Sequence, residues 1–388
     1  MAAAFGLDQA QMADGAVRQR VQVTSIDQFR DLFSGHVGAE QRDAFSAGAV
    51  RDPELTDAMH TLMHHVYGNG ELDAAASEHA NALFPVSVDL IAGKTHKIDT
   101  DEHVGPASAP VVIDVDELVF DGGSLTVETT VLTIKTRTLK ITKGSSKPGI
   151  NYLVGVTGSR GALGQHGQPG GPYNEPAQAG SDSSGNSPGI CTGAPNGGDG
   201  KAGAKGQIGE SPSEPGGNGR PNLPASLTFS SLDPSTQMPF VLMTQSGAGG
   251  KGGTGGTGGK GQEGGRGGNG CDTGCEGTNG GVGGAAGEGG DGGKGGPGGN
   301  GVAGQPIEIT RPRSDKSQFQ VVAYSAPAGE GGDRGEPGPP GSPGKGGKGG
   351  KHRVNGADGG GATQGSAGGI GIPGSQTGAA GIVTFHDA

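Results

Sequence analysis

Apolar residues recur at helical spacing in the first 85 residues. A helix capped by Thr24 or Ser25 would carry one apolar face, made of Ile26, Phe29, Leu32 and Phe33. Asp52-Pro53 opens a second helix, which Asn69-Gly70 ends, with an apolar face made of Leu55, Met59, Leu62, Met63 and Val66. A third helix runs from about Glu71 to Leu83 and stops before Pro85, because the residue before a proline avoids helical geometry. We therefore expect residues 1–85 to form a small α-helical module for attachment or assembly.

Residues 86–150 change to alternating or clustered β-branched residues. The segments VSVDLI, PVVIDVDELVF, SLTVETTVLTI and TLKIT predict short strands, with turns at Gly93 and at Gly122-Gly123. Short strands with tight turns are typical of a β-sandwich or a β-solenoid. We expect an all-β domain in this range.

From residue 151 the dominant pattern is glycine at every third position. The glycines of one run fall on those of a later run at an offset of 80 residues, and on those of an earlier run at an offset of 88. The glycines in this phase are Gly161, Gly164, Gly167, Gly170, Gly249, Gly252, Gly255, Gly258, Gly261, Gly264, Gly267, Gly270, Gly329, Gly332, Gly335, Gly338, Gly341, Gly344, Gly347 and Gly350. Residues 151–388 therefore contain three copies of one unit.

Each unit has two short strands, a Gly-x-x run that leads out, a loop, and a run that leads back. The returning runs are Gly197–Gly209, Gly281–Gly304 and about Gly356–Gly381. The final segment IVTF, residues 382–385, resembles the strand that would open a further unit. The six runs are thus expected to form three hairpins.

A strict triplet of glycine is compatible with three structures. A disordered linker has no reason to hold its phase over eight triplets. Collagen needs an unbroken register rich in imino acids, but the run from Gly249 to Gly270 has no proline and each run turns back. We favour polyglycine II helices, with three residues per turn and a rise of about 3.1 Å, in which every third glycine lets neighbouring main chains approach and hydrogen bond. Ordering so many glycines costs entropy, so the strands must anchor the runs.

The predicted fold class is thus multidomain. It combines an α-helical module (1–85), an all-β domain that is a sandwich or a solenoid (86–150), and a bundle of six antiparallel polyglycine II helices (151–388) built from three β-hairpin/Gly-x-x repeats.

The glycine runs resemble those of two families of polyglycine II proteins over residues 150–388. One is the receptor-binding tail-fibre-tip adhesins of T-even-like bacteriophages, and the other is the snow flea antifreeze protein. The first resemblance implies that variable loops at the end of the bundle bind a receptor. The second implies ice binding, but long charged side chains such as Lys251, Glu263 and Arg334 spoil the flat face that ice binding requires.

Charge and composition exclude several classes of function. A net charge of −11 gives no electrostatic support to a nucleic-acid partner. The N-terminal stretch has no basic region followed by a long apolar run, so we expect neither a classical signal peptide nor membrane insertion. The triplet of His60, His64 and His65 lacks a supporting carboxylate or thiol, and we expect no metal and no cofactor. No combination of residues predicts a catalytic site, so we expect a protein that is not an enzyme.

The loops between outgoing and returning runs are the candidate binding site, because loops on a rigid scaffold are common binding sites. We assign them to about Gly171–Asn196, to CDTGCEGTN from Cys271, and to KHRVNGADGGGATQG from Lys351. The candidate binding residues, which are polar or aromatic groups suited to sugar, are Tyr173, Asn174, Asp272, Glu276, His352, Arg353 and Asn355. The alternative is that these residues only close the hairpins.

All three cysteines fall in these loops. Cys191 could pair with Cys271 or with Cys275 and join two hairpins, Cys271 could pair with Cys275 within one loop, or the thiols could be free.

These features predict a non-enzymatic structural or recognition protein. Its loops would bind a cell-surface receptor or a glycan, at the end of a fibre or on a surface. Residues 1–150 would mediate homo-oligomerisation or attach the chain to a fibre, virion or surface assembly. The alternatives are a self-assembling block of a filament or surface layer, and an ice-binding protein. The expected location is extracellular, cell-surface or virion-associated, with the cytoplasm as the alternative.

Overall fold

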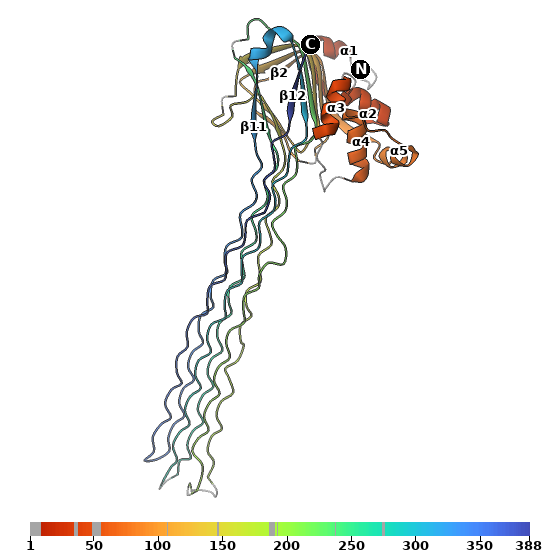
Figure 1. The fold of residues 1–388 in the computed structure, drawn as a ribbon. Coiled ribbons are helices and arrows are strands. Elements are labelled where there is room, and N and C mark those ends of the chain that lie inside the picture. The colour runs from red at the N-terminus through yellow and green to blue at the C-terminus, as the bar shows by residue number, and fades with distance from the viewer. Residues whose placement is uncertain are drawn as a thin grey trace.

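Two β-sheets and a group of helices form one end of the molecule, and long glycine-rich segments extend away from them (Figure 1). The computed structural model describes residues 9–34, 38–48, 56–106, 108–145, 147–185, 191, 193–236, 238–273 and 276–388. No helix among these residues is both long enough and apolar enough to cross a membrane.

The described N-terminal residues hold five α-helices: α1 (Gln9–Asp14), α2 (Ile26–Ser34), α3 (Ala39–Gly48), α4 (Asp57–Tyr67) and α5 (Ala74–Asn81). The predicted cap of α2 is confirmed, because the Ser25 hydroxyl accepts the N–H of Gln28 at 3.2 Å. Thr56 is the N-cap of helix α4, and its hydroxyl accepts the N–H of Met59 at 3.3 Å. The predicted start of this helix at Asp52-Pro53, and Leu55 of its apolar face, lie outside the described residues. Helices α1 and α3 were not predicted.

The strands divide between two sheets. The large sheet has the order β1-β2-β4-β6-β8-β10-β12, and the small sheet has the order β11-β9-β7-β5-β3. The strands of the large sheet are β1 (Ala16–Val23), β2 (Val86–Ile98), β4 (Val111–Asp121), β6 (Leu132–Lys143), β8 (Ala225–Leu232), β10 (Ile307–Arg311) and β12 (Val383–Asp387). The strands of the small sheet are β3 (Glu102–Val104), β5 (Leu125–Glu128), β7 (Val154–Thr157), β9 (Phe240–Gln245) and β11 (Phe319–Tyr324), with the 3₁₀ helix η2 (Arg313–Gln318) before β11.

From β2 onward the chain alternates between the large and the small sheet, and every neighbouring pair is parallel except β1 with β2. Strand β12 pairs in parallel with β10, which confirms that the final segment returns to the position of a repeat-opening strand. The expectation of an entirely helical 1–85 is wrong. Val17, Val21 and Val23 alternate with polar residues, and this period of two places Ala16–Val23 at the edge of the large sheet.

Gly93 is also not at a turn, although the turn at Gly122-Gly123 is confirmed between β4 and β5. Gly93 lies inside β2 with a φ of 144°, where a Cβ atom would stand 2.1 Å from the Gly15 carbonyl oxygen. A glycine is needed there because the chain entering β1 passes directly over it.

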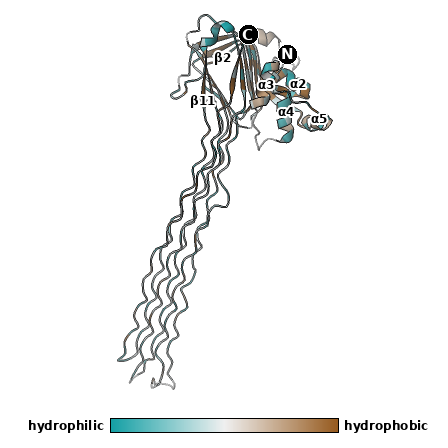
Figure 2. Cartoon of the chain, in the orientation of Figure 1, coloured by the Kyte–Doolittle hydropathy of each residue, from teal (hydrophilic) through white to brown (hydrophobic). Residues whose placement is uncertain are grey.

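Two apolar cores stabilise this end of the molecule. The first lies between the sheets and includes a cluster of aromatic rings, in which Phe240 lies 4.9 Å from Phe229 and 5.6 Å from Phe319 between ring centroids. The second lies between the helices and the outer side of the large sheet, where Phe29 and Leu62 pack near Val112. Figure 2 shows these brown residues concentrated in the sheets and helices, while the glycine-rich segments are pale.

We call the glycine-rich segments arms. Outgoing arms 1, 2 and 3 follow strands β7, β9 and β11, and returning arms 1, 2 and 3 lead into strands β8, β10 and β12. The outgoing arms are residues 158–183, 247–270 and 326–349, and the returning arms are residues 197–220, 278–304 and 356–381. Each arm pair is thus an insertion between a small-sheet strand and the next large-sheet strand.

Main-chain hydrogen bonds join each arm to its neighbours once per triplet. The Gly249 N–H donates to the Pro327 carbonyl at 3.0 Å, and the series continues to Gly270 and Lys348 at 2.8 Å. In outgoing arm 2 the following glycine donates as well, as Gly250 does to Gly217 at 2.8 Å. In outgoing arm 2, two of every three residues are therefore turned toward other arms, and the third faces solvent.

The predicted fold class is wrong. The structure is an α/β fold with a mixed seven-stranded sheet and a parallel five-stranded sheet, and not a C-terminal bundle of glycine helices. In their described residues the arms contain no helix and one isolated bridge, between Ala326 and Gly378, while a second bridge joins Asp272 to Gly277 beyond the end of outgoing arm 2. Strands from all three predicted ranges share the large sheet, so the expected all-β domain of 86–150 does not stand by itself.

The expectation of a glycine-rich repeat β-solenoid or of a fibre adhesin fails with it. The physical reason is that the apolar residues before each glycine run add parallel strands to existing sheets, because only there can they be buried.

Candidate recognition site at the distal loops

The three arm pairs end in loops that lie together at the end far from the sheets (Figure 1). The loops are the described parts of 184–196, 271–277 and 350–355, which we call distal loops 1, 2 and 3. Distal loop 1 is shorter than predicted. Outgoing arm 1 continues past Gly171, since Gly180 still donates to the Arg266 carbonyl at 2.7 Å and Ser183 to that of Asn269 at 2.8 Å.

Tyr173 and Asn174 therefore lie along outgoing arm 1 and not at its end. The Tyr173 hydroxyl donates to the Lys205 carbonyl of returning arm 1 at 2.9 Å. Both residues line a small cavity of about 170 Å³ beside Lys260 and Glu263 of outgoing arm 2. The insertion that begins at Gly171 breaks the glycine phase, and for this reason the sequence pattern resembles the start of a loop.

A disulfide between Cys191 and Cys271 joins distal loops 1 and 2, with Cα atoms 5.9 Å apart. Both cysteines are buried. The sequence is compatible with several cysteine pairings, and the structure contains the one between Cys191 and Cys271. Cys275 lies outside the described residues. Loop 1 also contacts the start of returning arm 2 through the Asn196 carboxamide oxygen, which accepts the Asn279 N–H at 3.1 Å.

Polar contacts join distal loops 2 and 3. The Asp272 carboxylate accepts the N–H of Lys351 at 2.9 Å. The Arg353 guanidinium pairs with the Glu276 carboxylate and donates through Nε to the Gly277 carbonyl at 2.9 Å. Most of the predicted binding residues in these loops therefore hold the loops to one another, and their charges are partly neutralised by each other.

Distal loop 3 is a tight turn in which the Arg353 N–H donates to the Gly350 carbonyl at 3.0 Å. His352 has a positive φ of 61° and an exposed side chain, and its imidazole makes no hydrogen bond to another described residue. Asn355 accepts the Gly349 N–H at 2.8 Å and closes the turn. Val354, which was not among the predicted binding residues, is 68% exposed. His352 and Val354 thus form an exposed imidazole and an exposed apolar group at the end of the molecule.

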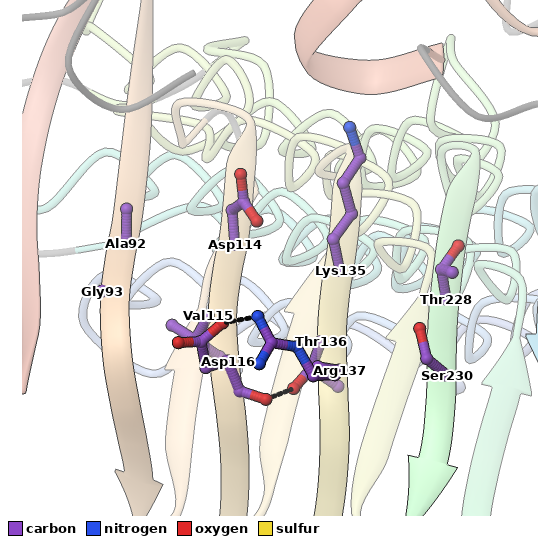
Figure 3. A pocket seen from close by; sticks show the side chains of 10 residues that line it. All are labelled: Ala92, Gly93, Asp114, Val115, Asp116, Lys135, Thr136, Arg137, Thr228 and Ser230. Atoms are coloured by element: carbon purple, nitrogen blue, oxygen red, sulfur yellow. Dashed lines mark hydrogen bonds and ion pairs between the residues drawn. The ribbon is translucent and has the colours of Figure 1, made fainter.

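A second candidate is a polar cavity of about 520 Å³ on the outer face of the large sheet (Figure 3). Local sequence patterns could not reveal this cavity, because its residues come from four strands. Asp114, Lys135 and Thr228 occupy one row across β4, β6 and β8, and the Arg137 guanidinium donates to Asp116 at 2.9 Å. The Lys135 ammonium group is buried and has no hydrogen-bond partner in the described chain.

Burial lowers the pKa of Lys135, while Asp114 and Asp31 act in the opposite direction. An amine of lowered pKa can bind an anion or act as a nucleophile. The cavity is wide open to solvent, and its second cation, Arg137, is already paired with Asp116. We therefore regard the distal loops as the stronger candidate site.

No group of histidine, cysteine and carboxylate side chains in the described residues is arranged to hold a metal ion. In α4, the ring of His65 is used instead in a contact with the Gly70 carbonyl at 3.0 Å, and His64 packs against Phe45. Comparison with known proteins adds no functional assignment, since no family model, curated protein or solved structure matches this chain.

Proposed function

We propose that this chain is a non-enzymatic recognition protein that binds a cell-surface receptor or a glycan through its distal loops. The observation that carries the proposal is the cross-linking of three loops from three repeats. A disulfide joins loop 1 to loop 2, and the Arg353–Glu276 ion pair joins loop 2 to loop 3. Loops ordered before binding lose less entropy when a ligand arrives, so such a surface is suited to recognition.

The arms support the same proposal because they separate the loops from the sheets. Outgoing arm 2 has 24 residues, and an extended chain with a rise of about 3.1 Å per residue would span about 70 Å. In this proposal residues 1–150 attach the chain to a larger assembly, and the loops reach a target outside the cell. A disulfide between loops is typical of oxidising environments.

The test is binding of the full chain to intact cells and to a printed array of defined oligosaccharides. His352→Gly combined with Val354→Ser removes the exposed imidazole and apolar group while keeping the turn, because glycine accepts a positive φ. We expect this variant to lose at least about tenfold in affinity, on the scale of a small interface hot spot.

Tyr173→Ala is the matched control, since Tyr173 is an exposed aromatic residue on the side of an arm. It should bind as well as the wild type. Equal binding by the loop variant, or no binding by a folded wild type to cells or sugars, would rule the proposal out. Electron microscopy of the same preparation distinguishes the alternative, because a filament or surface-layer block would form ordered polymers.

A further inference from the structure

The outward-facing side chains of the three outgoing arms form one continuous surface, which we call the outgoing face. Contacts between neighbouring arms show that these side chains lie on the same side. The Lys251 ammonium pairs with Asp333 at 2.7 Å, and the Arg266 guanidinium pairs with Asp182 at 3.2 Å. His166 accepts the Thr254 N–H through Nδ1 at 3.0 Å. The other ring nitrogen of His166, Nε2, is therefore available to a second partner.

Charges are separated along outgoing arm 3. One residue in each triplet of this arm faces outward, and distal loop 3 continues the series, in the order Glu330, Asp333, Glu336, Pro339, Ser342, Lys345, Lys348 and Lys351. Arg334 and Pro343 are exposed as well, but they share the phase of Gly331 and Gly346, whose Cβ positions face returning arm 3. The half near the sheets is therefore acidic on this face, and the half near the distal loops is basic. Within one chain Lys345 also pairs with Asp358 of returning arm 3 at 2.8 Å, so a second copy would share this cation with Asp358.

This order is self-complementary for a second copy that runs in the opposite direction. An antiparallel copy centred between Pro339 and Ser342 brings Glu336 opposite the other Lys345, Asp333 opposite Lys348, and Glu330 opposite Lys351. Each pairing occurs twice because the arrangement has a twofold axis. A parallel copy would instead set every charge against itself.

The same register suits the neighbouring arm. Outgoing arms 2 and 3 keep one constant offset, since Gly252 donates to Glu330 and, six triplets later, Gly270 donates to Lys348. The twofold axis on arm 3 therefore fixes the pairing on arm 2. There it brings Lys260 opposite Glu263 and Lys251 opposite Asp272.

Outgoing arm 1 follows the same rule. Gly167 donates to Thr254, and Ser183 donates to Asn269, which places His166 and Asp182 at equal distances from the axis. The imidazole of one copy would thus meet the Asp182 carboxylate of the other. The charges of arm 3 alone place the axis, so the opposite charges that meet on arms 1 and 2 are independent support for the same register.

We propose that two copies of this chain associate antiparallel through their outgoing faces. The contact does not rest on the recognition proposal, and it places the distal loops of each copy beside the sheets of the other. A surface about 65 Å long and three chains wide, roughly 10–15 Å, gives on the order of 800 Å² per partner, which is a standard interface size. Exposed ion pairs are individually weak, so we expect a salt-sensitive dimer whose charges choose its direction.

Sedimentation equilibrium of the full chain tests the association. At low salt the wild type should have twice the 37.9 kDa monomer mass, and at about 1 M salt, where the Debye length is about 3 Å, it should be monomeric. Two triple variants reverse the halves of arm 3: one is Glu330→Lys, Asp333→Lys, Glu336→Lys, and the other is Lys345→Glu, Lys348→Glu, Lys351→Glu. Each alone should be monomeric, and an equal mixture of the two should recover the dimer mass.

Lys294→Glu is the control, because Lys294 is an exposed residue of returning arm 2 on the opposite side of the molecule and should leave the dimer unchanged. Thermal unfolding of every variant establishes that it is folded. A folded wild type that is monomeric at low salt overturns the proposal, and so does a dimer that persists in both triple variants.

Spin labels test the direction, in a Cys275→Ser background that keeps the Cys191–Cys271 disulfide. Labels at Ser342→Cys lie near the axis and should be about 20 Å apart, while labels at Thr254→Cys should be separated by about 45 Å along the arms. Short distances from both sites would indicate a parallel dimer and would overturn the antiparallel register.

Discussion

Glycine determines how closely the arms approach, one residue at a time. At Gly258 a Cβ atom would stand 2.0 Å from the Gly290 carbonyl oxygen, and at Gly264 it would stand 2.0 Å from that of Gly284. No side chain fits at such distances. The triplet phase in the sequence already separates these inward positions from the outward ones, where Lys260 and Glu263 are exposed.

We predict that Gly258→Ala lowers the free energy of unfolding by about 2–4 kcal/mol, because the methyl group must push two arms apart and weaken their hydrogen bonds. Gly360→Ala is the matched control. No atom lies within 4 Å of the position of its Cβ, so it should be neutral or stabilising by about 0.5 kcal/mol. Chemical denaturation measures both, and equal effects would contradict the close-approach argument.

The buried amine of Lys135 is expected to cost stability. Lys135→Met removes a group with no described hydrogen-bond partner and should raise the free energy of unfolding at neutral pH by on the order of 1 kcal/mol. The exposed Lys94 is the control, and Lys94→Met should change little. A destabilised Lys135→Met would mean that the ammonium group has a partner or a ligand.

The pH dependence of stability follows from the lowered pKa of Lys135 in the folded state. The unfolded chain then holds the proton up to about the ordinary pKa of 10.5, whereas the folded chain releases it at a lower pH. Stability contributed at this site should therefore rise with pH through the alkaline range until 10.5. Denaturation curves between pH 7 and 10 should show this rise in the wild type and a smaller one in Lys135→Met.

At the level of elements, the strand pattern of 86–150 and the helix around Phe29 were predictable from local periodicity. Strand β1 was missed because its central residues Arg18, Gln19 and Arg20 are exposed and polar, and its pairing partner lies about 70 residues away in β2. The local sequence pattern also could not predict which strands belong to which sheet, because the alternation of apolar and polar residues along a strand does not identify its neighbouring strands.

The disulfide is an element-scale constraint that links two hairpins 80 residues apart in sequence. Reduction, or Cys271→Ser, should lower the free energy of unfolding by about 2–4 kcal/mol, since the unfolded chain gains freedom. The measurement is denaturation with and without reductant.

Amide exchange locates the effect. Amides near the loops, such as Gly281, should exchange faster after reduction, while those near the sheets, such as Gly299, should not change. Faster exchange at both ends would show instead that the bond stabilises the arms as a whole.

For the whole molecule, the arms have few apolar side chains, so their order depends on main-chain hydrogen bonds and on the sheets at one end. We predict that amide exchange follows position in the arm array. Outgoing arm 2 and returning arm 2 lie between others and should exchange most slowly, and returning arm 3, at the edge, should exchange fastest among the arms. Peptide-resolved exchange by mass spectrometry gives the order.

Coil-like exchange throughout residues 247–304 would contradict the lateral hydrogen bonding and remove the support for ordered distal loops. Equal protection in all arms would instead show that the array opens only as one cooperative unit.

The sequence by itself determined the local features of this protein: the three repeats, the glycine phase, the strands that precede each run, and the presence of Cys191 and Cys271 near the far ends of the hairpins. Those follow from residue type and spacing, which act over a few residues. Only the tertiary structure decided that the strands join two sheets, that outgoing arm 1 runs past Tyr173, that Cys191 meets Cys271, and that Lys135 faces a cavity. These depend on which distant segments share hydrogen bonds and burial, and one chain's local pattern does not encode that choice.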